Sequence, residues 1–308
     1  MSERACVTGA SGFVGSAIVE ELVRRSVAVN ALVHRRNASP LGGKVRVIRA
    51  NLLDSAGLDD SISGCATVIH LVGIIKEMPK AGITFDRLHV QATRNVVESA
   101  KRVGVKRFIQ MSALGARADG ASEYHKTKWK AEEIVRGSGM DWTIFRPSLI
   151  HGPGGQFMRM EARWVRKQAP PYLFMPYFGA GISGLGGAGR LQPVYVLDVA
   201  RAFVDAIANL KTVGRSYGLG GAERLSWPEM HRAAAGAILG RKRAVLPIPA
   251  WYGRMLAAIV PGSLLPFNRD QIVMSQEDNT CDLSDFERDF GWKPLGFEET
   301  LREYCGRL

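Results

Sequence analysis

Apolar residues in the first half of the chain follow two alternating periods. Short, mostly apolar runs predict buried strands, and longer segments with apolar residues three or four positions apart predict helices. The strands are expected at Arg4–Thr8, Val27–Val33, Lys44–Ile48, Thr67–Val72, Lys106–Met111 and Asp141–Phe145. The helices between them are expected at Gly12–Arg25, Phe85–Val103 and Glu123–Arg136. This alternation predicts a doubly wound α/β domain, a parallel sheet with helices on both faces.

After Pro147 the pattern loosens, because prolines and glycines interrupt it. The elements expected there are helices at Val199–Leu210, Pro228–Leu239 and Phe297–Cys305 and a strand at Arg215–Leu219. We expect residues 1–150 to form the sheet domain and residues 151–308 a small C-terminal lobe, interleaved with the sheet and not an independent domain. Doubly wound folds bind substrates at the carboxyl edge of the sheet, so the lobe is expected over that edge.

Two long apolar stretches need a separate interpretation. Residues 168–189 are uncharged, but their prolines and glycines predict a loop, because a helix in lipid needs unbroken internal hydrogen bonds. Residues 249–267 hold a single Arg among apolar residues. We expect this second stretch to be buried under the sheet edge, and the alternative is docking on a membrane or a membrane complex.

The 308 residues carry a formal net charge of +12. Such an excess favours anionic partners, either a phosphate-bearing cofactor or an anionic membrane surface. Nucleic acid is not expected, because Lys and Arg are scattered and no nucleic-acid-binding motif is present. The widely spaced Cys6, Cys65, Cys281 and Cys305 predict reduced thiols and no metal site. With a strand expected so near the initiator Met, we expect no signal peptide, and a cytoplasmic protein or one peripheral to the inner face of a membrane.

The first predicted strand runs into TGASGFVG, residues 8–15, and a predicted helix follows. In a dinucleotide-binding (Rossmann) loop, Gly9 would allow the tight turn, Gly12 the approach of the pyrophosphate, and Gly15 the packing of the helix on the sheet. The open amino terminus of that helix would bind the phosphates. A plain turn is the alternative, but the flanking strand and helix favour a cofactor site. The other loop residues assigned to this site are Ser11, Phe13 and Val14.

The end of the second strand bears on the choice of cofactor. In NAD-binding sheets an acidic residue about twenty positions after the loop binds the ribose hydroxyls. Here the chain reads VHRRN at residues 33–37, with His34, Arg35 and Arg36 and no acid. Arg can pair with the 2′-phosphate of NADP through charge-assisted hydrogen bonds, whereas the alternative is a solvated basic turn. We therefore expect NADP(H) in preference to NAD(H).

Tyr124 and Lys128 follow the fifth strand and lie four residues apart on a predicted helix, hence on one face. A phenol has a pKa near 10 and needs a neighbouring cation to act as an acid–base at neutral pH. The Lys128 ammonium could be that cation. This spacing also arises by chance, but its position just past the carboxyl end of a central strand favours a catalytic pair.

Four segments together resemble the short-chain dehydrogenase/reductase superfamily: TGASGFVG, HLVG at 70–73, YHKTK at 124–128 and FRPSLIHGPG at 145–154. Their order and spacing are similar to its extended, epimerase-like branch, and the similarity covers nearly the whole chain. Within that branch, HLVGIIKE at 70–77 and RLQPVYVLDVARA at 190–202 resemble the nucleotide-binding accessory subunit of respiratory complex I and its bacterial relatives.

The resemblance implies a role for each matching position. Tyr124 would be the acid–base, and Lys128 would bind the nicotinamide ribose and lower the pKa of Tyr124. The pyrophosphate would lie on the three loop glycines. The remaining cofactor positions would be Asn51 and Leu52 at the adenine, Leu71, Val72 and Gly73 at the ribose, His89, and Pro147 with Ser148 at the nicotinamide. Relatives usually carry Asp where Asn51 stands, and they often carry Asn where His89 stands.

One further departure concerns catalysis. The resemblance aligns the substrate-binding Ser or Thr of active relatives with Ala113, one residue after Ser112. We keep Ser112 with Tyr124 and Lys128 as the candidate catalytic residues, although a shift of one residue in a strand points the side chain to the opposite face. Losing one such donor lowers a rate by about 10²–10³-fold. The cofactor site is thus expected to be complete and the catalytic site incomplete.

Other residues near the predicted cleft have two interpretations. His70 and His151 could reach a substrate or could be structural histidines. Met158, Met160 and Trp164 share an approximately helical spacing, which favours packing over ligand binding.

Two functions are consistent with these features. The first is an NADP(H)-binding oxidoreductase-type protein that transfers hydride to or from a carbonyl, hydroxyl or quinone-like carbon of a small molecule. The second is a non-catalytic, nucleotide-binding accessory or assembly protein of a complex I-like membrane complex. The sequence identifies neither the substrate nor the oligomeric state.

Overall fold

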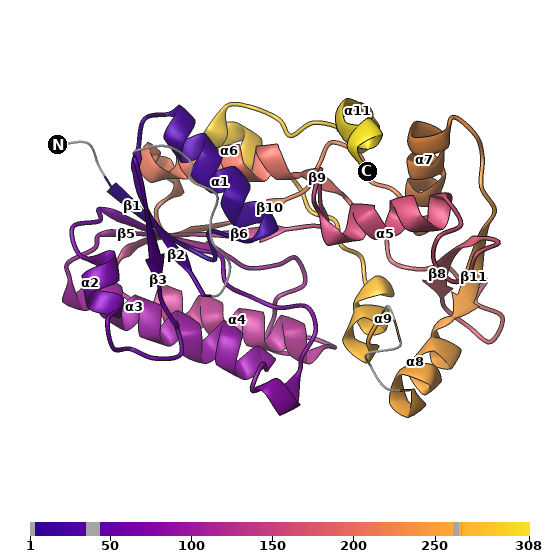
Figure 1. Cartoon of the computed structure of the whole chain (residues 1–308), viewed down its shortest axis with the longest axis horizontal. Helices are drawn as coiled ribbons and strands as arrows, with labels where there is room; N and C mark the ends of the chain where they lie inside the picture. The colour runs from indigo at the N-terminus through magenta and orange to yellow at the C-terminus, as the bar shows by residue number, and fades with distance from the viewer. Residues whose placement is uncertain (1–3, 35–43, 261–264, 266) are drawn as a thin grey trace. The chain divides into compact units, whose positions relative to one another are not determined.

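The computed structural model of the chain describes residues 4–34, 44–260, 265 and 267–308 (Figure 1). The chain forms two compact units. Unit 1 comprises Met1–Pro147, Val196–Leu219 and Leu283–Trp292, and unit 2 comprises Ser148–Tyr195, Gly220–Asp282 and Lys293–Leu308. Neither unit is therefore a single continuous segment.

Unit 1 is built on a parallel sheet. Among the described residues, this sheet has seven strands in the order β3-β2-β1-β4-β5-β6-β10, and every neighbouring pair is parallel. The strands are β1 Arg4–Thr8, β2 Ala28–Val33, β3 Val45–Arg49, β4 Thr67–His70, β5 Arg107–Met111, β6 Asp141–Pro147 and β10 Arg215–Leu219. The strand order reverses between β1 and β4, so their carboxyl ends border the crevice where doubly wound sheets bind ligands. The predicted fold class is confirmed.

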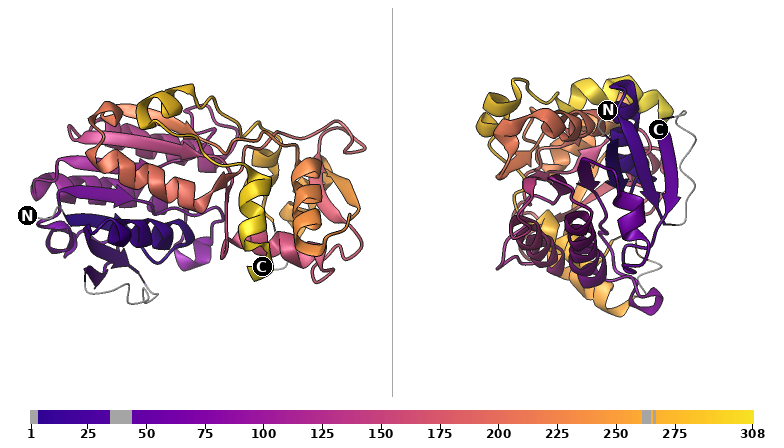
Figure 2. Two further views of the ribbon diagram at one scale, coloured as in Figure 1. Left: turned by 90° about the horizontal axis from the view of Figure 1, so that it is seen from above. Right: turned by 90° about the vertical axis from the view of Figure 1, so that its left-hand side faces the viewer.

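Helices cover both faces of this sheet. On one face α1 (Phe13–Arg24) and α6 (Val196–Ala208) lie side by side (Figure 2). On the other face lie α2 (Leu58–Ile62), α3 (Ala92–Arg102) and α4 (Glu123–Arg136) (Figure 1). The smaller elements of unit 1 are the turns η1 Pro79–Ala81 and η3 Leu210–Thr212, the π-helical turn η2 Asp86–Gln91, and α10 Ser284–Phe290. The central strands β1, β2, β4 and β5 are thus buried on both faces, as parallel sheets require.

Arg107 fastens several of these elements together. Its guanidinium donates to the carbonyl oxygens of Ala206 and Asp141 and to the hydroxyls of Thr143 and Thr212, at 2.6–3.2 Å. Burial lowers the pKa of Arg107 to about 10. Because a buried cation is tolerated only when its donors are paired, this network joins β5 and β6 to α6 and η3.

Unit 2 consists of helices and short parallel strand pairs. β8 (Met175–Gly179) pairs with β11 (Val245–Pro249), and β7 (Ile150–His151) pairs with β9 (Val194–Tyr195). The helices are α5 Gln156–Val165, α7 Trp227–Leu239, α8 Ala250–Ile259, α9 Arg269–Ser275, α11 Phe297–Tyr304 and the turn η4 Cys305–Arg307. α5 packs against α7, which begins at a capping box between Ser226 and Glu229.

Most predicted elements are present. β1, α4 and β10 have the predicted bounds, and the helix predicted at Phe85–Val103 is divided into η2 and α3. The loop predicted over residues 168–189 contains the short strand β8. No helix in the described ranges is long and apolar enough to span a bilayer. Five helices had no predicted range: α2, α5, α8, α9 and α10. Of these, α2 has only five residues and so shows hardly more than one turn of apolar spacing.

The predicted burial of residues 249–267 is wrong for their described part. In α8 only Ala250 and Gly253 are buried, whereas Trp251 is 47%, Met255 43% and Ile259 72% exposed. The sequence shows that this stretch is apolar, but burial also requires a neighbouring element to cover it.

Candidate functional site

The loop between β1 and α1 has the backbone geometry that its glycines predict. Gly9 has a φ of +70°, in the left-handed region that favours glycine. A Cβ on Gly15 would overlap the carbonyl oxygen of Gly9, so no side chain fits where α1 starts against the loop. A Cβ on Gly12 would lie 3.1 Å from the same oxygen. The three glycines therefore allow a tight turn that leads directly into a helix.

The amino terminus of α1 suits an anionic group. The N-cap residue is Gly12, which has no side chain to accept a hydrogen bond from the first turn. The first turn also holds no acidic residue. The first N–H groups of a helix have no partner inside the helix, and they carry its positive dipole end. A pyrophosphate fits these donors, so the residues present are compatible with a dinucleotide.

The carboxyl end of β2 lies next to this loop. Ala10 donates its N–H to the carbonyl oxygen of Leu32 at 3.3 Å, and the exposed His34 follows two residues later. Arg35 and Arg36, on which the NADP expectation depends, lie outside the described residues.

The segment after β4 lies against the loop from the other side. The Leu71 N–H donates to Thr8 Oγ1 at 3.2 Å. A Cβ on Gly9 would lie 3.3 Å from Cγ2 of Val72. The glycine loop therefore lies between the ends of β2 and β4, as the strand order requires.

His70 is a structural residue and not a group facing a substrate. Its Nδ1 lies 2.8 Å from Thr8 Oγ1, and its Nε2 lies 3.1 Å from Thr93 Oγ1. The Thr93 hydroxyl donates to a backbone carbonyl, so we assign the Nε2 proton to His70, donating to Thr93. Burial lowers the pKa of His70 to about 3, so the ring is neutral and joins β1, β4 and α3.

Gly73, His89 and Lys128 meet beyond the end of β4. A Cβ on Gly73 would lie 3.1 Å from Nζ of Lys128 and 3.3 Å from Nε2 of His89. The Lys128 ammonium donates to the Met111 carbonyl oxygen at 3.0 Å, and burial lowers its pKa to about 8. A side chain at position 73 would thus crowd a buried cation.

His89 is held as a neutral ring. It lies in η2, and its Nδ1 is 2.9 Å from Oγ1 of Thr127, whose hydroxyl donates to backbone carbonyls of α4. The Nδ1 proton therefore points at Thr127, and Nε2 accepts the Ile74 N–H at 3.1 Å. Burial, and next the charge of Lys128, lower the pKa of His89 to about 2. π-helical turns such as η2 are frequent at functional sites.

Tyr124 adjoins this group. Its ring meets those of His89 and Phe85 edge-on, with centroids 5.4 and 5.8 Å apart. Burial raises the pKa of Tyr124 to about 12, so the phenol keeps its proton at neutral pH. The lowering by Lys128 that the resemblance implies stays a prediction.

Ser112 lies where the pairing of β5 and β6 continues beyond β5. The Ser112 N–H donates to the Phe145 carbonyl at 2.7 Å, and the Leu114 N–H donates to the Pro147 carbonyl at 3.1 Å. Side chains alternate along such an extended segment, so Ser112 shares the face of Phe108, which packs against α3 and α4. Within the described ranges, the buried Ser112 Oγ has no hydrogen-bond partner. Ala113 points to the opposite face.

The remaining predicted positions do not take part in the contacts that link the glycine loop to Gly73, His89 and Tyr124. Asn51 is exposed, and its Oδ1 accepts the Leu53 N–H at 3.2 Å. The carbonyl of the buried Leu52 accepts from Asn95 at 2.8 Å. Pro147 is buried at the end of β6. Ser148 belongs to unit 2, where its hydroxyl bonds to Asn279.

Two further predicted groups in unit 2 are structural. His151 is buried, its Nδ1 lies 2.8 Å from the Tyr304 hydroxyl, and burial lowers its pKa to about 3. In α5, Met158 is fully buried, and Met160 and Trp164 are half-buried. The packing interpretation of this face is confirmed.

Sequence reasoning missed the three threonines that orient the histidines. The hydroxyls of Thr8 and Thr93 hydrogen-bond to the two ring nitrogens of His70. The Thr127 hydroxyl hydrogen-bonds to Nδ1 of His89. One indication of Thr127 was present in the sequence, because this residue lies three positions after Tyr124 and directly before Lys128. The partners of a threonine on another element, however, are set by the tertiary fold.

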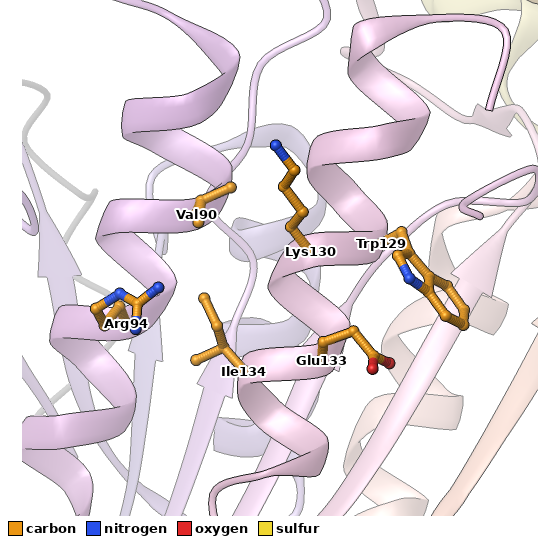
Figure 3. Close-up of a pocket in the computed structure, with 6 residues that line it drawn as sticks. All are labelled: Val90, Arg94, Trp129, Lys130, Glu133 and Ile134. Carbon is orange, nitrogen blue, oxygen red and sulfur yellow. The ribbon is translucent and has the colours of Figure 1, made fainter. Parts of the chain in front are cut away.

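A separate hollow lies between η2, α3 and α4 (Figure 3). Its cavity volume is about 450 Å³. It is lined by Val90, Arg94, Trp129, Lys130, Glu133 and Ile134. None of the predicted cofactor or catalytic residues lines it, so it is not part of the candidate site.

The sequence matches known proteins in the region of this site. A family model described as NAD(P)H-binding matches residues 9–163. The ceramide reductase of Caulobacter vibrioides is 33% identical over 252 residues, which cover 79% of this chain and 73% of that protein. The mitochondrial NADH dehydrogenase [ubiquinone] 1 alpha subcomplex subunit 9 of Arabidopsis thaliana is 29% identical over 73% of this chain, which spans only 56% of that subunit.

The fold is also found in solved structures. That of MoeE5 in complex with UDP-glucose and NAD superposes with a TM-score of 0.75, 22% identity and coverage of 99% of this chain and 98% of that chain. At this identity the likeness concerns the fold alone. The family match and the ceramide reductase relationship show that the chain belongs to the NAD(P)-binding, extended short-chain dehydrogenase/reductase-like family, which confirms the resemblance in the sequence.

Replacing Gly15 with Ala should disrupt both the fold and the cofactor site. The new Cβ has to displace the Gly9 carbonyl, so we expect the free energy of unfolding to fall by about 1–3 kcal/mol. The affinity for NADPH should fall at least tenfold, because the turn and the helix terminus shift together. Urea denaturation and calorimetric titration measure the two effects.

The matched control is Gly236→Ala in α7, where a Cβ would meet nothing within 4 Å. This change should leave NADPH affinity intact and stabilise the protein by roughly 0.5–1 kcal/mol. Equal NADPH affinity in both variants would contradict the assignment of the glycine loop.

Replacing Lys128 with Met should stabilise the protein. The pKa of Lys128 is lowered from 10.5 to about 8, so below pH 8 its charged form costs about 3 kcal/mol of folding free energy. This cost disappears as the pH rises through 8 toward 10.5. Met also leaves the Met111 carbonyl without its donor, so we expect a net gain of about 1–2 kcal/mol at pH 7.

Urea denaturation at pH 7 and pH 10 measures this gain, which should shrink or reverse at the higher pH. The exposed Lys101, replaced with Met in the same way, serves as the control and should show no such dependence. A destabilised Lys128 variant at pH 7 would show that the buried ammonium contributes net stability.

Proposed function

We propose that this chain binds NADP(H) along the carboxyl edge of the unit 1 sheet and acts as an oxidoreductase on a carbonyl, hydroxyl or quinone-like substrate. NAD(P) binding follows from the family. The observation that carries the proposal is the continuous row of contacts from Gly9 through Val72, Gly73 and His89 to Lys128 and Tyr124.

The row is compatible with a dinucleotide along its whole length. The start of α1 would hold the pyrophosphate, and Leu71–Gly73 would lie along a ribose. Asn51 and Leu52 would flank the adenine, and Pro147 would meet the nicotinamide. Glycine at position 73 would bring the ribose close to Lys128, whose ammonium is buried nearby.

The basic residues after β2 support NADP(H) over NAD(H). Because Ala10 bonds to Leu32, the segment that begins with His34 starts beside the phosphate loop. Arg35 and Arg36 follow directly in the sequence. In this place a guanidinium would favour a 2′-phosphate, and an acidic residue would favour free ribose hydroxyls.

In the proposed reaction each side chain has a distinct task. Bound NADP(H) supplies or accepts the hydride. In the reducing direction Tyr124 donates its proton to the substrate oxygen as the carbonyl carbon becomes tetrahedral, and in the oxidising direction it takes the proton back. Lys128 stabilises the phenolate that forms in between. The unpaired hydroxyl of Ser112 donates a hydrogen bond to the same oxygen.

The geometry favours Ser112 over position 113 for this last task. Ser112 lies on the sheet face that α4 covers, and Tyr124 and Lys128 are both on α4. A buried hydroxyl without a partner is unusual in a protein and is explained if a ligand completes its hydrogen bonding. The relationship to ceramide reductase favours a lipid carbonyl or hydroxyl as the substrate.

The alternative function is a nucleotide-binding accessory or assembly role in a complex I-like membrane complex. The raised pKa of Tyr124 favours it, because a phenol with a pKa of about 12 is a weak acid and holds almost no phenolate at neutral pH. The relationship to the complex I subunit also supports it. Both functions use the same cofactor site and differ in whether Tyr124 transfers a proton.

Removing Arg35 and Arg36 should lower the affinity for NADPH but not for NADH. Two charge-assisted hydrogen bonds are lost, so the double variant Arg35→Ala/Arg36→Ala should bind NADPH roughly 10–100-fold more weakly. Calorimetric titration with both coenzymes measures this. The control Lys101→Ala removes an exposed cation elsewhere and should change neither affinity. Tighter binding of NADH by the unmodified chain would refute the NADP preference.

Tyr124→Phe should abolish turnover and preserve coenzyme binding. NADPH oxidation with long-chain lipid ketones and quinones should fall by about 10²–10⁴-fold, because the proton donor is lost. Ser112→Ala should lower the rate by about 10²–10³-fold. Tyr172→Phe, in unit 2 and 55% exposed, is the matched control. Turnover by Tyr124→Phe at the unmodified rate would exclude the mechanism, and no turnover by the unmodified chain would favour the accessory function.

A further inference from the structure

We propose that unit 2 carries a docking surface for the anionic face of a phospholipid bilayer. The surface is centred on a loop–helix patch, defined as Ile182, Leu185, Trp251, Tyr252, Met255 and Ile259. All six side chains are large, apolar and at least 40% exposed. This inference does not depend on the proposed oxidoreductase function.

The helical part of the patch is a continuous stripe. Trp251, Met255 and Ile259 are spaced four residues apart in α8, so they lie on one helix face. Tyr252 lies beside them, and its ring centroid is 5.9 Å from that of Trp251. Helix faces of this kind normally pack on a core, yet this one is exposed to solvent.

The loop part lies next to the start of α8. β8 and β11 are parallel, so the loop after β8 and the helix after β11 emerge from the same end of the pair. The Trp251 indole donates to the carbonyl oxygen of Ile182 at 3.1 Å, which joins the two parts. The loop is closed by a hydrogen bond from the Gly186 N–H to the carbonyl oxygen of Ala180, at 3.0 Å. Ile182 and Leu185 lie between these closing residues and are 89% and 74% exposed.

Exposed apolar side chains are concentrated in this part of the chain. The described residues include fifteen large apolar side chains that are exposed. Nine of them fall within residues 162–195 and 230–269: the six of the patch together with Tyr172, Leu173 and Leu246. Single exposed apolar residues are ordinary, whereas a cluster of them marks an interaction surface.

The charge of the same two segments favours an anionic partner. Residues 162–195 contain four Lys and Arg, residues 230–269 contain six, and neither segment contains Asp or Glu. Arg254 lies exposed within α8 itself, and Arg241 and Lys242 lie exposed just before β11. Basic residues combined with exposed Trp, Tyr and aliphatic residues are typical of surfaces that bind anionic lipid headgroups and insert side chains among acyl chains.

A bilayer fits these features better than a second copy of the chain. Two copies packed through this surface would bring together segments that carry only positive charge, which would repel each other. A bilayer instead offers anionic groups and an apolar interior at the same surface. Trp and Tyr are also enriched at membrane interfaces. No helix in the described residues can cross the bilayer, so the docking is peripheral.

Vesicle co-sedimentation of the full chain tests this proposal. The chain should bind vesicles of phosphatidylcholine with phosphatidylglycerol, and it should bind phosphatidylcholine alone much more weakly. Added salt should weaken the binding, because it screens the headgroup charge. The variant Ile182→Glu/Trp251→Glu should bind at least roughly tenfold more weakly, because apolar insertion is replaced by repulsion.

Matched controls separate this surface from a general loss of apolar or positive residues. Leu210→Glu changes a 78% exposed apolar residue of unit 1 and should leave vesicle binding unchanged. Arg241→Gln/Lys242→Gln should weaken binding roughly thirtyfold at low salt, at about 1 kcal/mol for each charge. Lys101→Gln/Lys106→Gln, in unit 1, should have a much smaller effect. Circular dichroism confirms that each variant is folded.

Three outcomes would overturn the proposal. The first is that the unmodified chain does not sediment with anionic vesicles or binds neutral vesicles equally well. The second is that the unit 1 controls lose binding as much as the patch variants. The third is that light scattering shows a dimer that the patch variants dissociate, because the patch would then be an interface between two copies.

Discussion

The close approach of α1 to the β1 loop is the constraint on which the site depends. The helix can begin at Phe13 only because Gly15 has no side chain to meet the Gly9 carbonyl. This start places uncapped N–H groups beside the ends of β2 and β4. The strand order then fixes which segments surround them, because that order reverses between β1 and β4 while the strands stay parallel. In the proposed site, phosphate binding would thus be a consequence of backbone packing and not of any charged side chain.

Beyond the loop, the site is organised by buried polar groups that are kept neutral or paired. His70 and His89 are neutral rings oriented by threonines, so they add hydrogen bonds without adding charge. Lys128 is different, because burial lowers its pKa and its charge costs folding free energy. The charged Lys128 beside Gly73 therefore lowers the free energy of unfolding, and packing alone does not explain why a buried lysine is present there. A bound anionic coenzyme provides the missing compensation in the proposed function.

Parts of this arrangement could be predicted from the sequence because local rules determine them. The glycine spacing and the period of α4 depend on backbone geometry and on residues four apart, and both are found as predicted. The side of the sheet that Ser112 faces could not be predicted, since it depends on how far β5 continues to pair with β6. The exposure of α8 could not be predicted either. Hydrophobicity shows which residues favour burial, but only the tertiary fold shows whether an element covers them.

The exposed surface of α8 bears on both proposed functions. A reductase acting on a lipid would gain from residence at a bilayer, where its substrate is concentrated, and an accessory protein would gain from proximity to a membrane complex. The patch alone therefore does not decide between them. The decision rests on Tyr124, whose raised pKa makes proton transfer unfavourable until a cation and a bound ligand lower it. Lys128 is already buried on the same helix face. In the proposed reaction, the bound coenzyme would bring the two side chains into one hydrogen-bonded group.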